Sequence, residues 1–104
     1  MTWRVDFLPE VEEDVAGAAS WYDSRQAGLG ADFVEEVVLV WDALAENPLL
    51  NSRRHPIKNI RWRYPARFPY RIIFEVIENE RLVVVAAVLH AARHDREWKR
   101  RFAN

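Results

Sequence analysis

The alternation of apolar and polar residues between positions 65 and 98 predicts two long neighbouring strands. Residues 70–77 alternate in character with a period of two, as expected for a strand. Residues 82–89 form an unbroken apolar run of β-branched residues and alanines, which is typical of a central strand covered on both faces. The polar segment 78–81 joins them, and Asn79 within it can adopt a positive φ. We therefore expect a hairpin at the middle of a sheet.

The residues ahead of this hairpin predict a short strand and two helices. Residues 3–7 alternate strictly, and Pro9 suits the first turn of a helix that stops near Gly28. The apolar stripe of this helix comprises Val11, Val15, Ala18 and Tyr22. A second helix is expected from about Gly30 to Glu46, where Asn47-Pro48 ends it.

The second predicted helix is more apolar than packing on one sheet requires. Its buried stripe consists of Phe33, Val37, Val40 or Trp41, and Leu44. Val34, Val38 and Leu39 widen the apolar surface beyond that stripe. A helix that is apolar on more than one side is either deeply buried or covered by a partner, and in so small a domain we favour a partner.

The remaining segments complete an α+β fold. Residues 49–56 resemble an exposed basic loop, and residues 58–64 read as an edge strand. Ile60, Trp62 and Tyr64 fall on one face of that strand, and Arg61 and Arg63 fall on the other. A short basic helix is expected from Asp95 to Phe102. The predicted order is β-α-α-β-β-β in a single domain over residues 1–104, with a helical hairpin on one face of a twisted, mostly antiparallel four-stranded sheet and a basic C-terminal helix or tail.

The burial expected of individual side chains follows from these faces. The predicted core contains Trp3, Phe7, Tyr22, Phe33, Leu44, Ile72, Phe74, Val84 and Val88. The predicted solvated helix positions are Glu12, Glu13, Glu35 and Glu36.

Composition narrows the class of protein further. Half of the 104 residues are apolar, which excludes a disordered chain, and the length suits one hydrophobic core. The absence of cysteine excludes disulfides, thiolate chemistry and cysteine-bound zinc. No secretion signal and no apolar run near the ~20 residues of a membrane span are present, so we expect a cytoplasmic protein without a membrane partner. No metal site and no cofactor are predicted.

Charge is divided unevenly along the chain. Residues 1–47 carry eleven acidic residues and two arginines, whereas residues 48–104 carry thirteen basic and five acidic residues. This asymmetry predicts an acidic helical side and a basic sheet side that suits an acidic or phosphate-rich partner. Specifically, we expect Arg61, Arg67, Arg71 and Arg93 to gather on the sheet face turned away from the helices. The alternative is that these charges only keep a very apolar sheet soluble.

Several segments together resemble the RelE/ParE superfamily, the toxins of bacterial type II toxin–antitoxin modules, which are also described as plasmid-stabilisation proteins. They are Trp21-Tyr22, GLGADF at 28–33, ENP at 46–48, RFPYRIIFEV at 67–76 and VAAVLHAARHDREW at 85–98. The most specific parts are residues 67–71 and the spaced set His90, Arg93 and Trp98. The resemblance covers nearly the whole chain and agrees with the predicted element order.

The resemblance implies a growth-inhibiting toxin that a cognate antitoxin holds inactive in a toxin–antitoxin hetero-oligomer. The antitoxin would cover the surplus apolar surface of the second helix, at Val34, Val38, Leu39 and Trp41. Two branches share the fold: RelE-like toxins cleave mRNA on the ribosome, and ParE-like toxins are directed against DNA gyrase without cutting nucleic acid. The resemblance leaves the branch open.

A metal-independent ribonuclease needs a base, an acid and a fixed cation. Arg71, His90 and Arg93 are the candidates for these roles, although Arg71 could instead pair with Glu75 and His90 could be structural. Related nucleases carry a tyrosine near the C-terminus, whereas this chain has none after Tyr70. Trp98 stands in that region, and its indole N–H cannot act as a base.

These departures favour a ParE-like toxin that acts by binding. The predicted target-binding residues are Lys58, Arg61, Arg63, Arg67, Arg71, Arg93, Trp98, Lys99 and Arg100. The alternative is a ribosome-dependent mRNA endoribonuclease that uses Arg71, His90 and Arg93. A third possibility is a non-toxic nucleic-acid-binding domain in which Trp62 and Tyr64 stack on bases.

Overall fold

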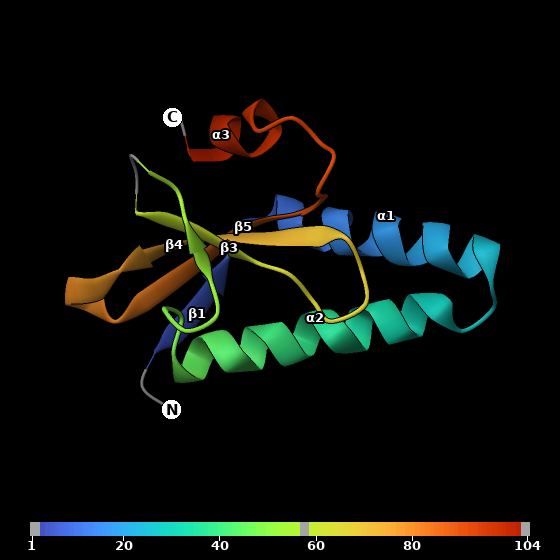
Figure 1. The fold of residues 1–104 in the computed structure, drawn as a ribbon, viewed down its shortest axis with the longest axis horizontal. Coiled ribbons are helices and arrows are strands. Elements are labelled where there is room, and N and C mark those ends of the chain that lie inside the picture. The colour runs from blue at the N-terminus through green and yellow to red at the C-terminus, as the bar shows by residue number, and fades with distance from the viewer. Residues whose placement is uncertain (1–2, 57–58, 103–104) are drawn as a thin grey trace.

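The computed structural model describes residues 3–56 and 59–102 as one α+β unit (Figure 1). Its elements are β1 (Arg4–Phe7), α1 (Glu10–Arg25), α2 (Leu29–Glu46), β2 (Arg53–Arg54), β3 (Ile60–Arg63), β4 (Tyr70–Ile77), the 3-10 turn η1 (Glu78–Glu80), β5 (Leu82–His90) and α3 (Arg96–Phe102). The predicted class, the helical hairpin, the central β4–β5 hairpin and the terminal helix are all confirmed.

The sheet has five strands in the order β1-β5-β4-β3-β2, so the predicted count of four is wrong. The additional strand is β2, whose two residues lie within the predicted basic loop and pair with β3. A two-residue strand is too short to give a period in the sequence. β3 is therefore an inner strand rather than the predicted edge. β1 runs parallel to β5, and the other pairs are antiparallel.

Helices cover both faces of the sheet. In Figure 1 α2 lies on one side of the strands and α3 lies on the other. α1 shares the larger core with α2 and so covers the same face as α2. The larger core, on the side of α1 and α2, includes Phe33, Val37, Ile72, Phe74 and Val85. The smaller core, under α3, consists of Ile60, Ile73, Ala87, Leu89 and Trp98. The chain therefore forms three layers, and the apolar runs of β4 and β5 are explained by burial on both faces.

A β-bulge in β5 exchanges its two faces part-way along the strand. Phe74 pairs with Val85 and Ile73 pairs with Ala87, so Ala86 is the extra residue between them. Val85 before the bulge and Val88 after it both face α1 and α2, although they are an odd number of positions apart. His90, two residues beyond Val88, consequently lies on the side of α1.

Two turns differ in detail from the prediction. α1 ends at Arg25, and Gly28 instead precedes α2 with a φ of 89°, which a glycine adopts without strain. In the β4–β5 link, Arg81 rather than Asn79 has the positive φ, of 51°. The tight contact that fixes the α1–α2 hairpin is made by Gly30, whose N–H donates to Asp23 Oδ1 at 2.8 Å.

Three burial predictions are wrong, and two of them concern residues of the surfaces described below. Val84 was predicted to be core, but it is half-buried and belongs to neither core. Phe7 was predicted to be core, but its side chain is 45% exposed because β1 lies beside the gap between α1 and α2. Glu36 was predicted to be solvated, but it is buried against the β3–β4 loop.

Candidate functional site

The basic residues do not gather on one face of the sheet, so that prediction is wrong. Arg61 pairs with Phe74 and Arg63 pairs with Ile72, and residues paired across a ladder project to the same side. Phe74 and Ile72 face α1 and α2. The error arose because the apolar face of β3 was assumed to pack on the helical hairpin, whereas Ile60 and its neighbours pack under α3.

Arg67 also lies on the side of α2, where it fastens the β3–β4 loop to Glu36. The Arg67 backbone N–H donates to Glu36 Oε1 at 2.9 Å, and the Arg67 side chain donates to Glu36 Oε2. Burial acts to raise the pKa of the Glu36 carboxyl, but the hydrogen bonds from Arg67 outweigh it and hold that pKa below its ordinary value. Arg67 is thus engaged in a structural pair.

Arg71 is buried under α3 and is bonded within the chain. Its guanidinium donates to Asp95 Oδ1 at 2.9 Å and to the Arg93 carbonyl at 3.1 Å, and it lies over the Trp62 ring. The residue is 7% exposed, so the predicted role as a surface contact is not compatible with its position. The alternative pairing with Glu75 is also wrong, since the partner is Asp95. Arg71 therefore ties the segment after β5 to the sheet.

His90 lies on the opposite side of the sheet from Arg71. Its ring contacts Tyr70, with centroids 5.3 Å apart, and it lines a cleft together with Trp21 and Arg93. The His90 Nδ1 accepts a 3.0 Å hydrogen bond from the Ala92 N–H. Burial raises the pKa of Tyr70, partly offset by the charge of Arg93. The structure thus brings His90 and Arg93 into one cleft. The Arg71 guanidinium reaches only the backbone carbonyl of Arg93 and lies on the opposite side of the sheet from His90.

The C-terminal helix α3 carries a basic outer surface above an apolar anchor. Trp98 is fully buried in the smaller core, so its predicted contact with a target is replaced by a structural role. Arg93, Arg96, Lys99 and Arg100 are exposed around it. Glu97 makes ion pairs with Arg100 at 2.9 Å and Arg93 at 3.7 Å. Of the predicted target-binding residues, Arg93, Lys99 and Arg100 therefore remain accessible as a group.

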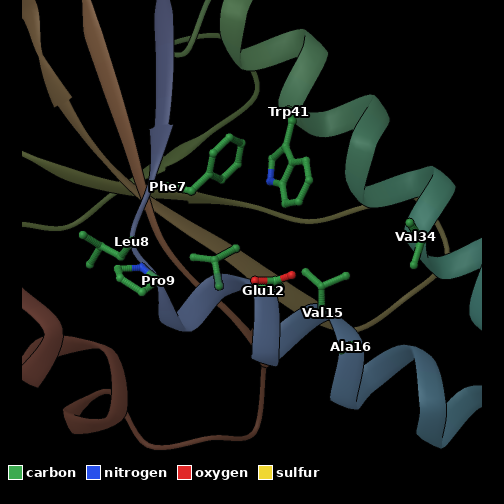
Figure 2. A pocket seen from close by; sticks show the side chains of 9 residues that line it. Phe7, Leu8, Pro9, Glu12, Val15, Ala16, Val34 and Trp41 are labelled. Atoms are coloured by element: carbon green, nitrogen blue, oxygen red, sulfur yellow. The ribbon is translucent and has the colours of Figure 1, made fainter.

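An apolar groove opens between β1, α1 and α2 (Figure 2). Its main hollow is lined by Phe7, Leu8, Pro9, Val11, Val15, Val34 and Trp41, with Glu12 and Ala16 at its side. An adjoining hollow, which shares Phe7 and Trp41, is lined by Val38, and we call the two together the Phe7 groove. Its main hollow has a volume of about 500 Å³. The rings of Phe7 and Trp41 meet edge to face with centroids 4.7 Å apart, and Figure 2 shows them side by side in the groove.

Three of the four predicted partner-binding residues line this groove, namely Val34, Val38 and Trp41. The fourth, Leu39, lies on the other flank of α2 beside Tyr64. Phe7 was missed, because its alternation with Trp3 and Val5 resembles that of a core residue. The Trp41 Nε1–H is buried without an acceptor among residues 3–56 and 59–102.

Three further observations delimit the site. Lys58, predicted to contact the target, lies outside the described residues. Within the described parts of the chain, no three His, Asp or Glu side chains are placed to share a metal ion. No helix formed by those parts has both the length and the apolar character needed to cross a membrane.

Comparison with known families identifies the fold that carries these surfaces. The family model described as the ParE toxin of the type II toxin–antitoxin system, parDE, matches residues 5–95. The chain belongs to the ParE toxin family. The resemblance to the RelE/ParE superfamily is therefore confirmed, and the match is to its ParE branch. A search of curated proteins gave no significant match.

Solved structures of toxin–antitoxin systems share the architecture of this ParE family member. The chromosomal ParDE system from P. aeruginosa superposes with a TM-score of 0.74 at 12% identity, covering 86% of this chain and 96% of that one. The intact E. coli RelBE complex gives 0.63 at 19% identity, covering 88% and 99%. RelBE2 from Mycobacterium tuberculosis gives 0.56 at 18% identity, covering 86% and 99%. At these identities the likeness is one of fold.

Proposed function

We propose that this toxin inhibits bacterial growth in the ParE manner, by binding DNA gyrase rather than by cutting mRNA. The observation that carries the proposal is the separation of Arg71 from His90. Arg71 is buried under α3 and bonded to Asp95, while His90 opens on the side of α1. Because a ribonuclease needs its cation and its proton donor at one phosphate, this arrangement argues against the nuclease trio.

The proposed target-binding surface is the basic exterior of α3 and the segment before it. Arg93, Lys99 and Arg100 are exposed there, and the helix is held in place by Trp98 beneath it. A gyrase complex offers acidic protein surface and DNA phosphates, and both suit such a cluster. Binding through exposed charged side chains of this kind weakens as the salt concentration rises.

The proposed antitoxin-binding surface is the Phe7 groove. Phe7, Val34 and Val38 are large apolar side chains that the fold leaves exposed, and they adjoin one another around Trp41. An amphipathic helix from an antitoxin would bury this surface in the helix-in-groove mode.

One observation supports the second candidate function, that of an mRNA endoribonuclease. His90 and Arg93 line the same cleft as Tyr70, so an acid–base group and a cation lie together there without Arg71. A metal-independent endoribonuclease could use such a pair. The third possibility, base stacking on Trp62 and Tyr64, is weakened because the Trp62 ring packs against the smaller core and under the Arg71 guanidinium. Tyr64 alone of the two is exposed.

Induction of the toxin in a bacterial host, without antitoxin, separates these functions. We expect filamentation and a DNA-damage response, with gyrase–DNA complexes trapped in extracts. The variant Lys99→Glu/Arg100→Glu should lose these effects, whereas Arg4→Glu, an equally exposed change on β1, should keep them. Rapid arrest of translation with cleaved transcripts, abolished by His90→Asn, would instead establish the nuclease.

A further inference from the structure

The outer flank of α2 carries a second hollow, separate from the Phe7 groove. We call it the Tyr64 hollow; it is lined by Glu36, Leu39, Val40, Asn51, Arg63, Tyr64 and Ala66. Its volume is about 440 Å³. The hollow lies where α2 meets the end of β3 and the turn that follows α2. None of the helices or strands described here closes it from outside.

Exposed apolar side chains surround this hollow. Leu39 is 61% exposed and Tyr64 is 43% exposed, and both line it. Leu50, which is 58% exposed, adjoins the hollow because its carbonyl accepts a hydrogen bond from the lining residue Arg63. Several large apolar side chains around one hollow indicate a protein-binding surface more than chance exposure does.

The charge at the Tyr64 hollow that no ion pair neutralises is positive. Glu36 is the acidic residue among its lining side chains, and both of its carboxylate oxygens accept hydrogen bonds from Arg67. Arg63 makes one long bond of 3.4 Å to the Leu50 carbonyl. Arg54 pairs with Arg61 and projects to the same side of the sheet, although it does not line the hollow itself. A partner with apolar side chains flanked by Asp or Glu would complement this surface.

The Tyr64 hollow and the Phe7 groove are the two flanks of one helix. Val38 lines the groove and Leu39, the next residue, lines the hollow. Successive residues are about 100° apart around a helix, so the two surfaces are separated by the outer ridge of α2. A single chain crossing that ridge can bury both. Because the two surfaces adjoin along α2, we infer that the partner that fills the groove also fills the hollow.

We propose that the antitoxin straddles α2, with an apolar helix face in the Phe7 groove and an acidic, apolar-bearing segment in the Tyr64 hollow. This inference rests on the proposed neutralisation by an antitoxin and adds the chemistry of its second contact. Arg63 and Arg54 are then antitoxin-binding residues rather than the target-binding residues that their charge suggests. The hollow adds charge selectivity to a groove whose lining is mainly apolar.

Binding measurements on the purified toxin test this proposal, with its full-length cognate antitoxin as the probe. Arg54→Glu/Arg63→Glu should raise Kd at least about tenfold and reduce its dependence on salt. Arg53→Glu is the matched control, since Arg53 pairs with Trp62 and projects to the opposite face of the same strand. It should leave Kd and salt dependence unchanged. Val34→Asp/Val38→Asp, in the groove, should abolish binding.

The possible outcomes are distinct. Restoration of affinity to Arg54→Glu/Arg63→Glu by an antitoxin with Lys in place of its acidic residues establishes the contact. Wild-type affinity for Arg54→Glu/Arg63→Glu, together with loss of binding in the groove variant, overturns the second contact and leaves the proposed neutralisation intact. An antitoxin that binds all variants equally, or binds none of them, overturns both. A toxin homodimer that Tyr64→Ser dissociates would assign the hollow to a second copy and likewise overturn it.

Discussion

The carboxylate of Asp14 on α1 and the guanidinium of Arg101 on α3 form a two-point ion pair, with N···O distances of 2.6 and 3.1 Å, across the edge of β5 that β1 leaves open. Asp14 Oδ2 also accepts from the Val88 N–H at 2.9 Å, and Arg101 donates to the Ala86 carbonyl at 2.9 Å. The two side chains thus take the place of a neighbouring strand beyond the end of β1.

Removing one member of this pair should be costly, because both side chains are largely buried. Arg101→Met removes the compensating charge from the buried Asp14 carboxylate, which keeps only the Val88 N–H, and it removes the Arg101 bond to the Ala86 carbonyl. We expect the free energy of unfolding to fall by about 3 kcal/mol. Arg100→Met removes the exposed pair with Glu97 and should cost less than about 0.5 kcal/mol. Urea unfolding measures both. Equal effects of the two substitutions would contradict a structural role for the pair.

A pair of glycine substitutions in the helical hairpin should have opposite effects. A Cβ on Gly30 would lie 2.4 Å from the Ala19 carbonyl oxygen, so Gly30→Ala forces α1 and α2 apart. We expect a loss of about 2 kcal/mol or more in unfolding free energy. Gly17 has nothing within 4 Å of the added atom, and Gly17→Ala should stabilise α1 by about 0.5–1 kcal/mol. Thermal unfolding of the two variants compares them directly.

The Arg71–Asp95 pair should fix α3 on the sheet. Arg71→Met removes the charge-assisted bond to Asp95 and the bond to the Arg93 carbonyl, and we expect a cost of about 2 kcal/mol. Amide hydrogen exchange should accelerate at residues 93–102 more than at the strand β4, because α3 opens before the sheet does. Uniform acceleration across the chain would show that α3 has no separate opening.

Acid should weaken the same attachment. Burial alone would raise the pKa of Asp95, but the hydrogen bond from Arg71 holds that pKa below its ordinary value. A carboxyl with a lowered pKa in the folded state contributes stability above its unfolded-state pKa, about 3.9, and loses that contribution as the pH falls through the folded-state value. Asp95→Asn should therefore be less stable than the wild type at pH 7, and the difference should shrink below about pH 4. A constant difference across this range, in urea unfolding at each pH, would exclude the pair as its source.

Local patterns were sufficient for the elements that repeat a period over several residues. The alternation at residues 70–77 and the apolar run at 82–89 gave β4 and β5, and the stripes of α1 and α2 gave the hairpin. The two residues of β2 were missed because they are too few to show a period. The β1–β5 pairing direction also has no local signal, since it is set by which segment completes the sheet.

The site was predicted less well than the fold. Its position depends on which face of each strand lies toward the helical hairpin and which lies toward α3. Alternation in β3 separates Arg61 from Trp62 but does not say which of them faces the helical hairpin. Once α3 covers the second face, the arginines turn toward α2. The partners of Arg71 and Glu36 lie 24 and 31 positions away in the sequence. Contacts over such separations produce no periodic pattern in a single amino-acid sequence. The surplus apolar surface of α2 was visible because it exceeds what one sheet can bury.

The parallel pairing of β1 with β5 sets the order in which this protein can mature. Arg4 lies opposite Leu82, so β1, the first strand to be synthesised, can pair only after β5, the last strand, has been made. Until then α1 and α2 lack the part of the larger core that β5 contributes, which includes Val83, Val85 and Val88. A nascent chain of this kind stays incompletely packed until synthesis is complete, and it is open to proteases or aggregation in that interval. Under the proposed neutralisation, the antitoxin can engage the helical hairpin within that interval, before the toxin has folded.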